Sequence, residues 1–308
     1  MKSFFAKLLL FGEYGLMFGG RALAVPYPRY GGHFLKPAEK WIGQPEENLF
    51  RTSNRELERF VSWFAHEELN DRMFFPLKLD RLRKDIGEQL CFQSDIPPEY
   101  GIGSSGALCA ALLYSYSSYP HALSLICRRH SLTEALKHDF VLMEAYFHGH
   151  SSGLDPLVSF LHQPVLFDNS RISLPRLPLN GERVSAYLLD TGQPGATTSL
   201  LSLFLEKMEN PDFRDRFRGE YMPANDGAIQ SFLGGEQDSL FGYLQRISRF
   251  QLNQLPEMIP AGYVLTMQKL LEQGIPVKLL GSGGGGYLLA FAHAGKDCVL
   301  PDRCLKVF

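Results

Sequence analysis

The chain has 308 residues, and its 31 Lys and Arg against 33 Asp and Glu give a formal net charge of −2 at pH 7. This balance argues against a nucleic-acid partner, because such binding needs many cations that neutralise phosphates. The basic clusters are short and mostly have acidic residues beside them, so we interpret them as solvated faces: Arg81–Lys84, Arg128–Arg129 and Arg214–Arg218. No apolar run approaches the ~20 residues of a membrane helix, which argues against a membrane protein.

The first residues imitate a secretory signal, since Lys2 precedes an apolar run. Lys7 and Glu13 interrupt that run, however, and leave no apolar segment of the ~7–15 residues that a signal peptide requires. The five cysteines are odd in number, widely spread and without a C-x-x-C pair: Cys91, Cys109, Cys127, Cys298 and Cys304. This usage favours reduced thiols, so the sequence predicts a soluble, cytoplasmic globular protein.

In chain order, the apolar run from Phe4 to Phe11 predicts a strand that ends at Gly12. Between Arg51 and Asn70, apolar residues recur at the helical period, and Ser53 with Glu56 has the pattern of a capping box. The same period places four apolar residues on one face of this helix: Leu57, Phe60, Val61 and Phe64.

Two further helices are predicted before the middle of the chain. The segment from Ala107 to Tyr116 is rich in Ala and Leu and follows a glycine cluster, which indicates a buried helix. Thr133 is expected to cap the second helix, which runs to about Phe147 and is closed by Gly149.

The second half mixes strands and helices. We expect strands at Val184–Asp190, near Pro276–Leu280 and at Tyr287–Phe291, and helices from Thr197 or Thr198 to Met208 and from Gly262 to Glu272. Elements that mix without strict alternation favour an α+β fold over a doubly wound parallel sheet. The least patterned stretch is roughly 169–182, and we place a domain boundary there, giving domains 1–172 and 173–308.

The first glycine cluster, Gly101–Gly106, opens the Ala-rich helix. Glycines let the backbone approach a ligand closely, and the exposed N–H groups of a helix N-terminus suit phosphate. The cluster also matches G-x-G-x-x-G, but a dinucleotide site needs an acidic residue about 20 positions later, and 107–133 contains no Asp or Glu. A simple turn or helix start remains an alternative from these residues alone.

The second cluster, Gly281–Gly286, has five glycines in six residues between two apolar strands. A hairpin needs only one or two glycines, and a flexible linker would not be flanked directly by strands. We therefore expect the backbone here to approach a ligand or another loop closely.

Three charged residues are ambiguous when taken singly. Lys7 within an apolar strand either reaches the surface or points into a site. Asp155 after a helix fits a turn or cap as well as a catalytic base, and Glu144 fits an exposed helix position. His148 and His150 could join Glu144 in a metal cluster, but no further ligand has a recognisable spacing, which argues against zinc.

Together these pieces resemble the GHMP kinases, the family of galactokinase, homoserine kinase, mevalonate kinase and phosphomevalonate kinase. All three family motifs occur in order, at Ala6–Gly15, Pro98–Ala107 and Lys278–Gly286. Within the family, Lys7–Glu13 and Ser151–Asp155 are most similar to mevalonate kinase. The resemblance spans essentially the whole chain. It implies an N-terminal domain with a left-handed βαβ unit, a ferredoxin-like C-terminal domain and an active site in the cleft between them.

The resemblance also implies residue roles. Asp155 would accept the proton of the acceptor hydroxyl, with Lys7 beside that hydroxyl and the γ-phosphate of ATP. Ser105 and Glu144 would hold Mg²⁺; Glu144 lies eleven residues before Asp155, as in the family. The acceptor would lie near Glu13, Tyr14 and Thr191. ATP would bind Gly101, Ile102, Gly103, Ser104, Ser105, Gly106, Gly283 and Gly284.

The sequence departs from the family pattern at three places. The Ala-Pro-Gly that usually precedes Lys7 is absent, and Tyr287 replaces the usual Cys or Ala. Tyr14 stands where mevalonate kinases typically have His and where phosphomevalonate kinases have Tyr, whereas Gly153–Pro156 is closer to the mevalonate type. The expected partner is a small molecule with a hydroxyl acceptor, most simply mevalonate; phosphomevalonate, a sugar and a non-catalytic binding role are the alternatives. The protein is expected to be a monomer or homodimer.

Overall fold

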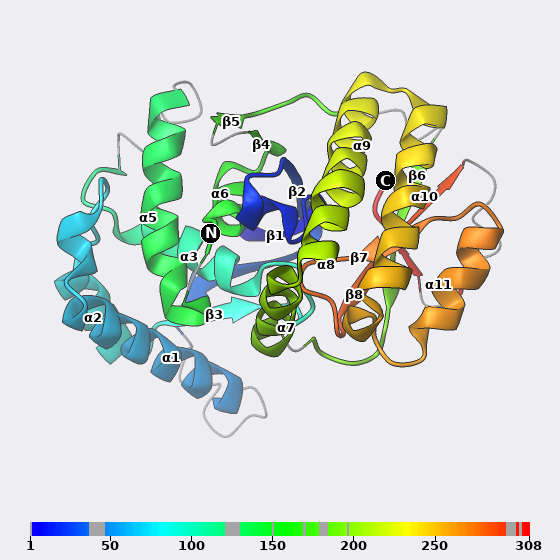
Figure 1. The fold of residues 1–308 in the computed structure, drawn as a ribbon. Helices are drawn as coiled ribbons and strands as arrows, with labels where there is room; N and C mark the ends of the chain where they lie inside the picture. Colours follow the sequence, from blue (N-terminus) through cyan, green and yellow to red (C-terminus); the bar gives the residue numbers. More distant parts are fainter. Residues whose placement is uncertain are drawn as a thin grey trace. The chain divides into compact units, whose positions relative to one another are not determined.

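The computed structural model describes residues 2–36, 47–120, 130–149, 151–168, 171–178, 184–195, 197–293, 300–301 and 304–308. The chain forms two compact units. Figure 1 shows their helices and strands, coloured along the sequence. Unit 1 comprises 1–7, 26–96 and 103–163, and unit 2 comprises 8–25, 97–102 and 164–308. Two strands, β1 (Phe4–Phe11) and β2 (Ala22–Leu35), contribute residues to both units. The predicted boundary after residue 172 stays a prediction.

Unit 1 is mainly helical. Its helices are α1 (Glu47–His66), the 3₁₀ turn η3 (Leu69–Arg72), α2 (Leu79–Gly87), α3 (Ser104–Tyr116), α5 (His130–His148) and α6 (Leu154–Leu161). The strand β3 (Cys91–Ser94) pairs antiparallel with residues 32–35 of β2. Helix α3 is apolar on all sides, contacts α5 and α6, and so lies in the core of the unit.

Unit 2 contains two sets of strands. The strand β4 (Val165–Asp168) pairs antiparallel with residues 22–24 of β2 and with β5 (Arg171–Ser173). A second sheet has the antiparallel order β7-β8-β6-β9 and consists of β6 (Val184–Asp190), β7 (Val277–Leu279), β8 (Tyr287–His293) and β9 (Cys304–Lys306). In this sheet β7 is an edge strand.

The α-helices of unit 2 follow β6 in the chain, whereas one 3₁₀ turn precedes it. They are α7 (Thr197–Glu209), α8 (Pro211–Arg216), a π-helical turn (Phe217–Tyr221), α9 (Met222–Gly234), α10 (Gln237–Gln254) and α11 (Tyr263–Glu272), with 3₁₀ turns at Gly15–Phe18 and Pro256–Met258. None of the helices in the described part of the chain is long and apolar enough to cross a membrane.

Most predicted elements are confirmed, and so is the α+β class. The strands 4–11 and 184–190 have the predicted bounds, and helix α3 begins at Ser104, three residues before the predicted start. The four apolar residues assigned to one face of α1 are all buried: Leu57, Phe60, Val61 and Phe64. Periodicity succeeds here because each segment buries one continuous apolar face.

Two local predictions are wrong. Helix α1 begins at Glu47, so Ser53 lies inside it; its hydroxyl donates to the Phe92 carbonyl at 3.1 Å and accepts from the Phe92 N–H at 2.8 Å. Thr133 likewise lies inside α5, where it is buried. Asn210 ends α7 as predicted, because α7 stops at Glu209, and its side chain also caps α8 by accepting the Asp212 N–H at 2.9 Å.

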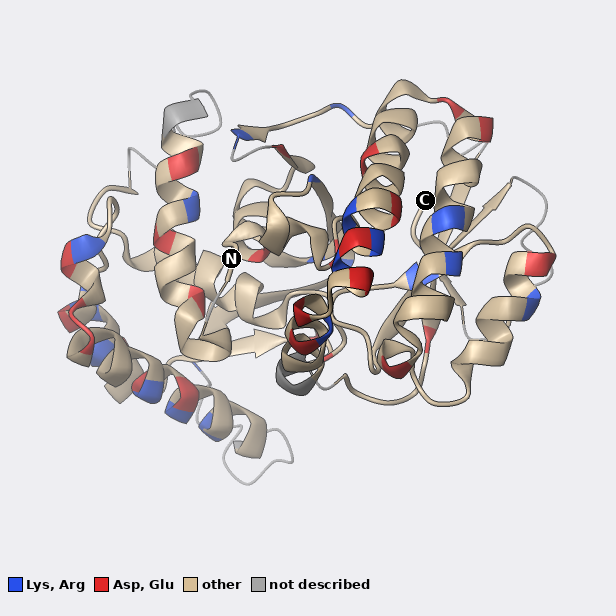
Figure 2. Cartoon of the chain, in the orientation of Figure 1, with Lys and Arg blue, Asp and Glu red and all other residues tan. Residues whose placement is uncertain are grey.

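In the basic clusters that the structure describes, all Arg and Lys side chains are exposed except the half-buried Arg214 (Figure 2). In α2, Arg81 and Arg83 each lie within 4.0 Å of an aspartate on the same helix, and Lys84 lies 4.0 Å from Glu88, which directly follows the helix, as a solvated face predicts. Cys91 and Cys109 are buried thiols. Arg128, Arg129, Cys127, Cys298 and His150 lie outside the described residues.

Candidate active site

The Lys7–Asp155 pair is the centre of the charged cluster in unit 1. The Lys7 ammonium lies 3.0 Å from Asp155 Oδ2; its own side chain is 5% exposed, whereas that of Asp155 is 32% exposed. Asp155 stands in the first turn of α6, after Gly153, whose φ of +70° begins the helix. The pair therefore presents a carboxylate that solvent and a substrate can reach, held by a cation that they largely cannot.

Glycines bring α3 up to this pair. A Cβ on Gly103 would lie 2.9 Å from Lys7 Cγ, and one on Gly106 would lie 2.9 Å from the backbone and Cβ of Asp155. Gly103 also has a φ of +80°, which favours glycine. Of the five glycines predicted to bind ATP, Gly103 and Gly106 thus have a structural reason to be glycine that is independent of any ligand.

The N-terminus of α3 is open to an anion. Gly103 occupies the N-cap position, no side chain of the described residues caps the helix, and its first turn carries no acidic residue. The first N–H groups of Ser104, Ser105 and Gly106 therefore have no side-chain cap from the N-cap residue, and the positive end of the helix dipole lies beside the Lys7–Asp155 pair. This arrangement suits phosphate oxygens.

Glu144 is buried near the pair, on α5. Its carboxylate accepts a hydrogen bond from the Ser151 hydroxyl. Burial raises the pKa of Glu144 well above its usual range, and the charge of Asp155 raises it further, while Ser151 and Lys7 oppose the rise. A buried carboxylate in this environment gains from an added cation, because the cation restores the stability of its charged form.

Ser105 and Glu144, the predicted Mg²⁺ ligands, have different partners here. The Ser105 hydroxyl lies 3.0 Å from His148 Nε2. Among the residues that the structure describes, no three His, Cys, Asp or Glu side chains gather closely enough to hold a metal ion. Mg²⁺ commonly takes only one or two protein oxygens, with water and substrate phosphates as its other ligands, so Ser105 and Glu144 fit that cation as a donor set.

Glu13 and Tyr14 lie in unit 2, in the turn after β1. The Glu13 carboxylate is buried and binds the ammonium of Lys278, which comes from β7. The Tyr14 hydroxyl donates to the Ser282 carbonyl, and its ring stacks on Phe204 with centroids 4.2 Å apart. Sequence reasoning missed Lys278 as a site residue, although a lysine between two apolar strand residues was as visible there as at Lys7.

The second glycine cluster packs against other loops. A Cβ on Gly283 would lie 2.4 Å from the Met258 carbonyl oxygen, one on Gly285 2.2 Å from that of Pro194, and one on Gly286 2.6 Å from Tyr100 Cα. The Gly284 N–H donates to the Met258 carbonyl at 2.7 Å. The predicted close approach is therefore made to backbone within unit 2.

Three other predicted residues belong to the same region of unit 2. A Cβ on Gly101 would lie 2.8 Å from the Leu280 carbonyl oxygen, and Ile102 is buried. The Thr191 hydroxyl donates to the Gly286 carbonyl at 2.7 Å. The residues before Gly103 thus pack beside the second glycine cluster, whereas Gly103 and the residues after it pack beside Lys7 and Asp155.

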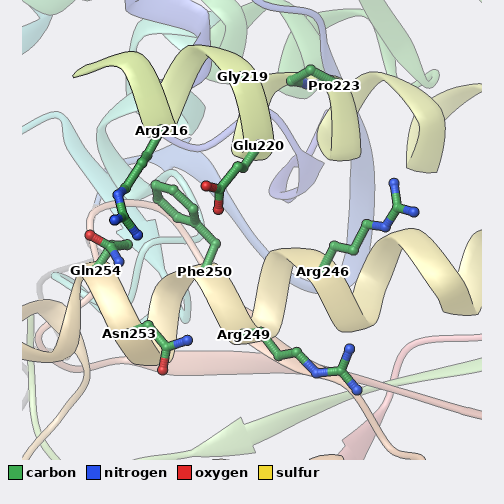
Figure 3. A pocket seen from close by; sticks show the side chains of 9 residues that line it. All are labelled: Arg216, Gly219, Glu220, Pro223, Arg246, Arg249, Phe250, Asn253 and Gln254. Carbon is green, nitrogen blue, oxygen red and sulfur yellow. The ribbon is translucent and has the colours of Figure 1, made fainter. Parts of the chain in front are cut away.

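A surface cavity of about 390 Å³ lies elsewhere in unit 2, between α10 and the chain from Arg216 to Pro223 (Figure 3). Three arginines line it: Arg216, Arg246 and Arg249. Figure 3 shows that their guanidinium groups do not converge on one point and that Glu220 extends into the same space. The cavity therefore has no concentrated positive charge for an anion.

Known proteins match this chain over most of its length. It is 25% identical to a mevalonate kinase of Pyrococcus abyssi, over 93% of this chain and 87% of that protein. The structure of Streptococcus pneumoniae phosphomevalonate kinase gives a TM-score of 0.64 at 13% identity, covering 100% of this chain and 97% of that one. L. major mevalonate kinase in complex with R-mevalonate gives 0.60 at 18% identity, covering 96% and 87%. No family model matches the chain.

The three motifs indicate a resemblance to the GHMP kinases, and this resemblance is confirmed. Mevalonate kinases are among the sequences that are similar to this chain. The α+β fold of that superfamily is confirmed as well.

Proposed function

We propose that this chain is an ATP-dependent kinase of the GHMP type, which transfers the γ-phosphoryl group of ATP to the hydroxyl of a small molecule, and that its acceptor is mevalonate. The observation that carries the proposal is the Lys7–Asp155 pair, 3.0 Å apart and packed against the uncapped N-terminus of α3. Phosphoryl transfer needs alignment and charge neutralisation more than covalent catalysis. This cluster supplies a carboxylate that can align the acceptor, and an ammonium and backbone N–H groups that can neutralise phosphate charge.

Each residue has a proposed task. The N–H groups of Ser104, Ser105 and Gly106 bind phosphate oxygens, and the Lys7 ammonium stabilises the charge that develops on the transferred group. Asp155 orients the acceptor hydroxyl and takes its proton. Ser105 and Glu144 would hold Mg²⁺, which neutralises phosphate charge when bound.

Mevalonate is proposed as the acceptor because the sequence relatives are mevalonate kinases and because Gly153–Pro156 has the mevalonate-kinase pattern. Tyr14 is the observation that favours phosphomevalonate. In this structure the Tyr14 hydroxyl donates to the Ser282 carbonyl. We therefore assign it a contact within the protein and not the place of the histidine that mevalonate kinases have at this position.

ADP release from Mg·ATP tests the proposal, with mevalonate, phosphomevalonate and a panel of hexoses offered separately. Turnover with mevalonate alone supports it. Turnover with another acceptor supports the kinase activity but contradicts mevalonate as the acceptor. No turnover with any of them, despite nucleotide binding, contradicts a kinase of these acceptors and favours a binding role.

Asp155→Asn tests the proposed base. We expect kcat to fall by at least ~10²-fold while ATP affinity stays nearly unchanged, because the amide keeps the shape of the side chain but cannot take a proton. Asp80→Asn, at a fully exposed aspartate on α2, is the matched control and should leave kcat unchanged. If Asp155→Asn retains turnover, another group is the base.

A further inference from the structure

Lys278 is a buried cation outside the predicted catalytic cluster. Its side chain is 1% exposed, and its ammonium binds Glu13 Oε1 as well as the Leu279 carbonyl oxygen, the latter at 2.9 Å. Burying two charges costs desolvation that their attraction often fails to exceed, so such a pair is weak evidence for stability. Stability therefore does not explain the Lys278–Glu13 pair, whereas holding the turn after β1 in one geometry does.

The pair holds the turn after β1. Tyr14 in that turn has a φ of +58°, a conformation that non-glycine residues adopt only when their surroundings enforce it. Two tyrosines add to the restraint: Tyr221 donates to the Glu13 carbonyl at 3.0 Å, and Tyr14 donates to the Ser282 carbonyl. Lys278 and Ser282 belong to the same glycine motif, so two bonds join the turn to it.

The strand that carries Lys278 is itself fixed by α10. The Ser248 hydroxyl donates to the Val277 carbonyl at 2.7 Å, and Gln251 Oε1 accepts the Leu279 N–H at 2.9 Å. These side chains satisfy the open edge of β7 on either side of Lys278. The ammonium is therefore presented from a rigid support, which a positioning residue requires.

We propose that Lys278 is a positioning residue: its bond to Glu13 holds Tyr14 and the glycine loop 281–286 in one arrangement, and Glu13 serves the reaction through this bond and not by contacting the acceptor. The inference rests on the proposed kinase function, with Tyr14 on the acceptor side. It changes the role assigned to Glu13 and adds a residue that no motif-based role covers.

Steady-state kinetics with the full chain test the role. Lys278→Met should raise the KM for the acceptor at least ~10-fold, because the displaced turn lies on the acceptor side. It should raise the KM for ATP less, because the N-terminus of α3, which is proposed to bind the phosphates, is not held by this pair. Lys278→Arg keeps a cation and should recover part of the loss. Lys269→Met, at an exposed lysine of α11, is the control and should change neither constant. An unchanged acceptor KM in Lys278→Met overturns the proposal.

A double-mutant cycle separates positioning from direct contact. If Glu13 acts only through Lys278, then Glu13→Gln combined with Lys278→Met should be no worse than the more damaged single variant. If Glu13 contacts the acceptor, the two losses should multiply, and that outcome overturns the proposal. The double variant leaves no lone buried charge, so it remains testable if a single variant does not fold.

Hydrogen exchange gives a readout that does not need turnover. Peptides covering 12–20 and 281–287 should exchange faster in Lys278→Met than in the wild type or Lys269→Met, while peptides of α3 and α6 should not change. Unchanged exchange in both loops overturns the positioning role. If the wild type turns over no acceptor, the kinase proposal fails, yet this measurement still decides whether the pair holds the two loops.

Discussion

At the scale of single residues, the space left by a glycine determines the position of Lys7 as much as the charge of its partner does. Lys7 reaches Asp155 because Gly103 has no Cβ that would meet its side chain. The sequence alone does not decide whether Lys7 reaches the surface or points into a site, because an apolar strand with one lysine is compatible with both. The same ambiguity hid Lys278, whose partner Glu13 lies 265 positions away. Pairing between distant positions is not encoded in any local pattern.

Gly103→Ala should displace Lys7 and lower kcat by at least ~10-fold. The new Cβ would lie 2.9 Å from Lys7 Cγ, closer than real Cβ contacts allow. Gly262→Ala is the matched control, because Gly262 has a similar φ, +83° against +80°, but nothing within 4 Å of an added Cβ. Both variants should lose about 1–2 kcal/mol of stability from backbone strain.

Steady-state ADP release and thermal unfolding of the two variants check this prediction together. A loss of kcat in Gly103→Ala alone would support the packing argument. Equal losses of kcat in both variants would contradict it, because backbone strain would then account for the effect.

At the scale of elements, Ser53 shows how tertiary contacts replace a local signal. The expected cap is an interior residue of α1 that exchanges two hydrogen bonds with Phe92 of β3. Ser53→Ala should therefore lower the free energy of unfolding by about 1–2 kcal/mol, since it leaves a Phe92 N–H and carbonyl without that partner. Denaturant unfolding measures the change.

Ser62→Ala on the same helix is the control. Its hydroxyl is exposed and donates only to the Glu58 carbonyl one turn earlier, so its loss should stay within about 0.5 kcal/mol. Equal effects of the two variants would mean that helix propensity, and not the bond to β3, determines the change.

The predictable elements are those with a continuous apolar period or a clear break. The strands 4–11 and 184–190 and helix α3 are of this kind. Strand β2 was not predicted because Pro26, Pro28, Gly31 and Gly32 interrupt its pattern, although each is tolerated locally. The helices from 211 to 254 were also missed; their buried aromatic residues pack on one another at positions that only the tertiary fold defines.

At the scale of the whole molecule, two motifs lie where the chain passes from one compact unit to the other. Lys7 closes a segment of unit 1 and Leu8 opens one of unit 2; Ile102 and Gly103 are divided in the same way. Each motif therefore contributes residues to both units: Lys7 and Glu13 from the first, Gly101 and Ser105 from the second. A boundary drawn once along the sequence could not anticipate this division.

Nucleotide binding should stabilise the whole chain through Glu144 when Mg²⁺ is present. A ligand at 100 times its Kd adds about 2.7 kcal/mol, which for a chain of this length raises Tm by about 4 °C. We expect a non-hydrolysable ATP analogue to give this shift with Mg²⁺ and a smaller one with EDTA. Glu144→Gln should reduce the difference between the two shifts, because the amide carries no charge to hold the cation. Glu134→Gln, at an exposed glutamate of the same helix, should keep the difference. A Glu144→Gln protein whose shift depends on Mg²⁺ as strongly as that of the wild type would remove Glu144 from the cation site and leave Ser105 as its one assigned ligand.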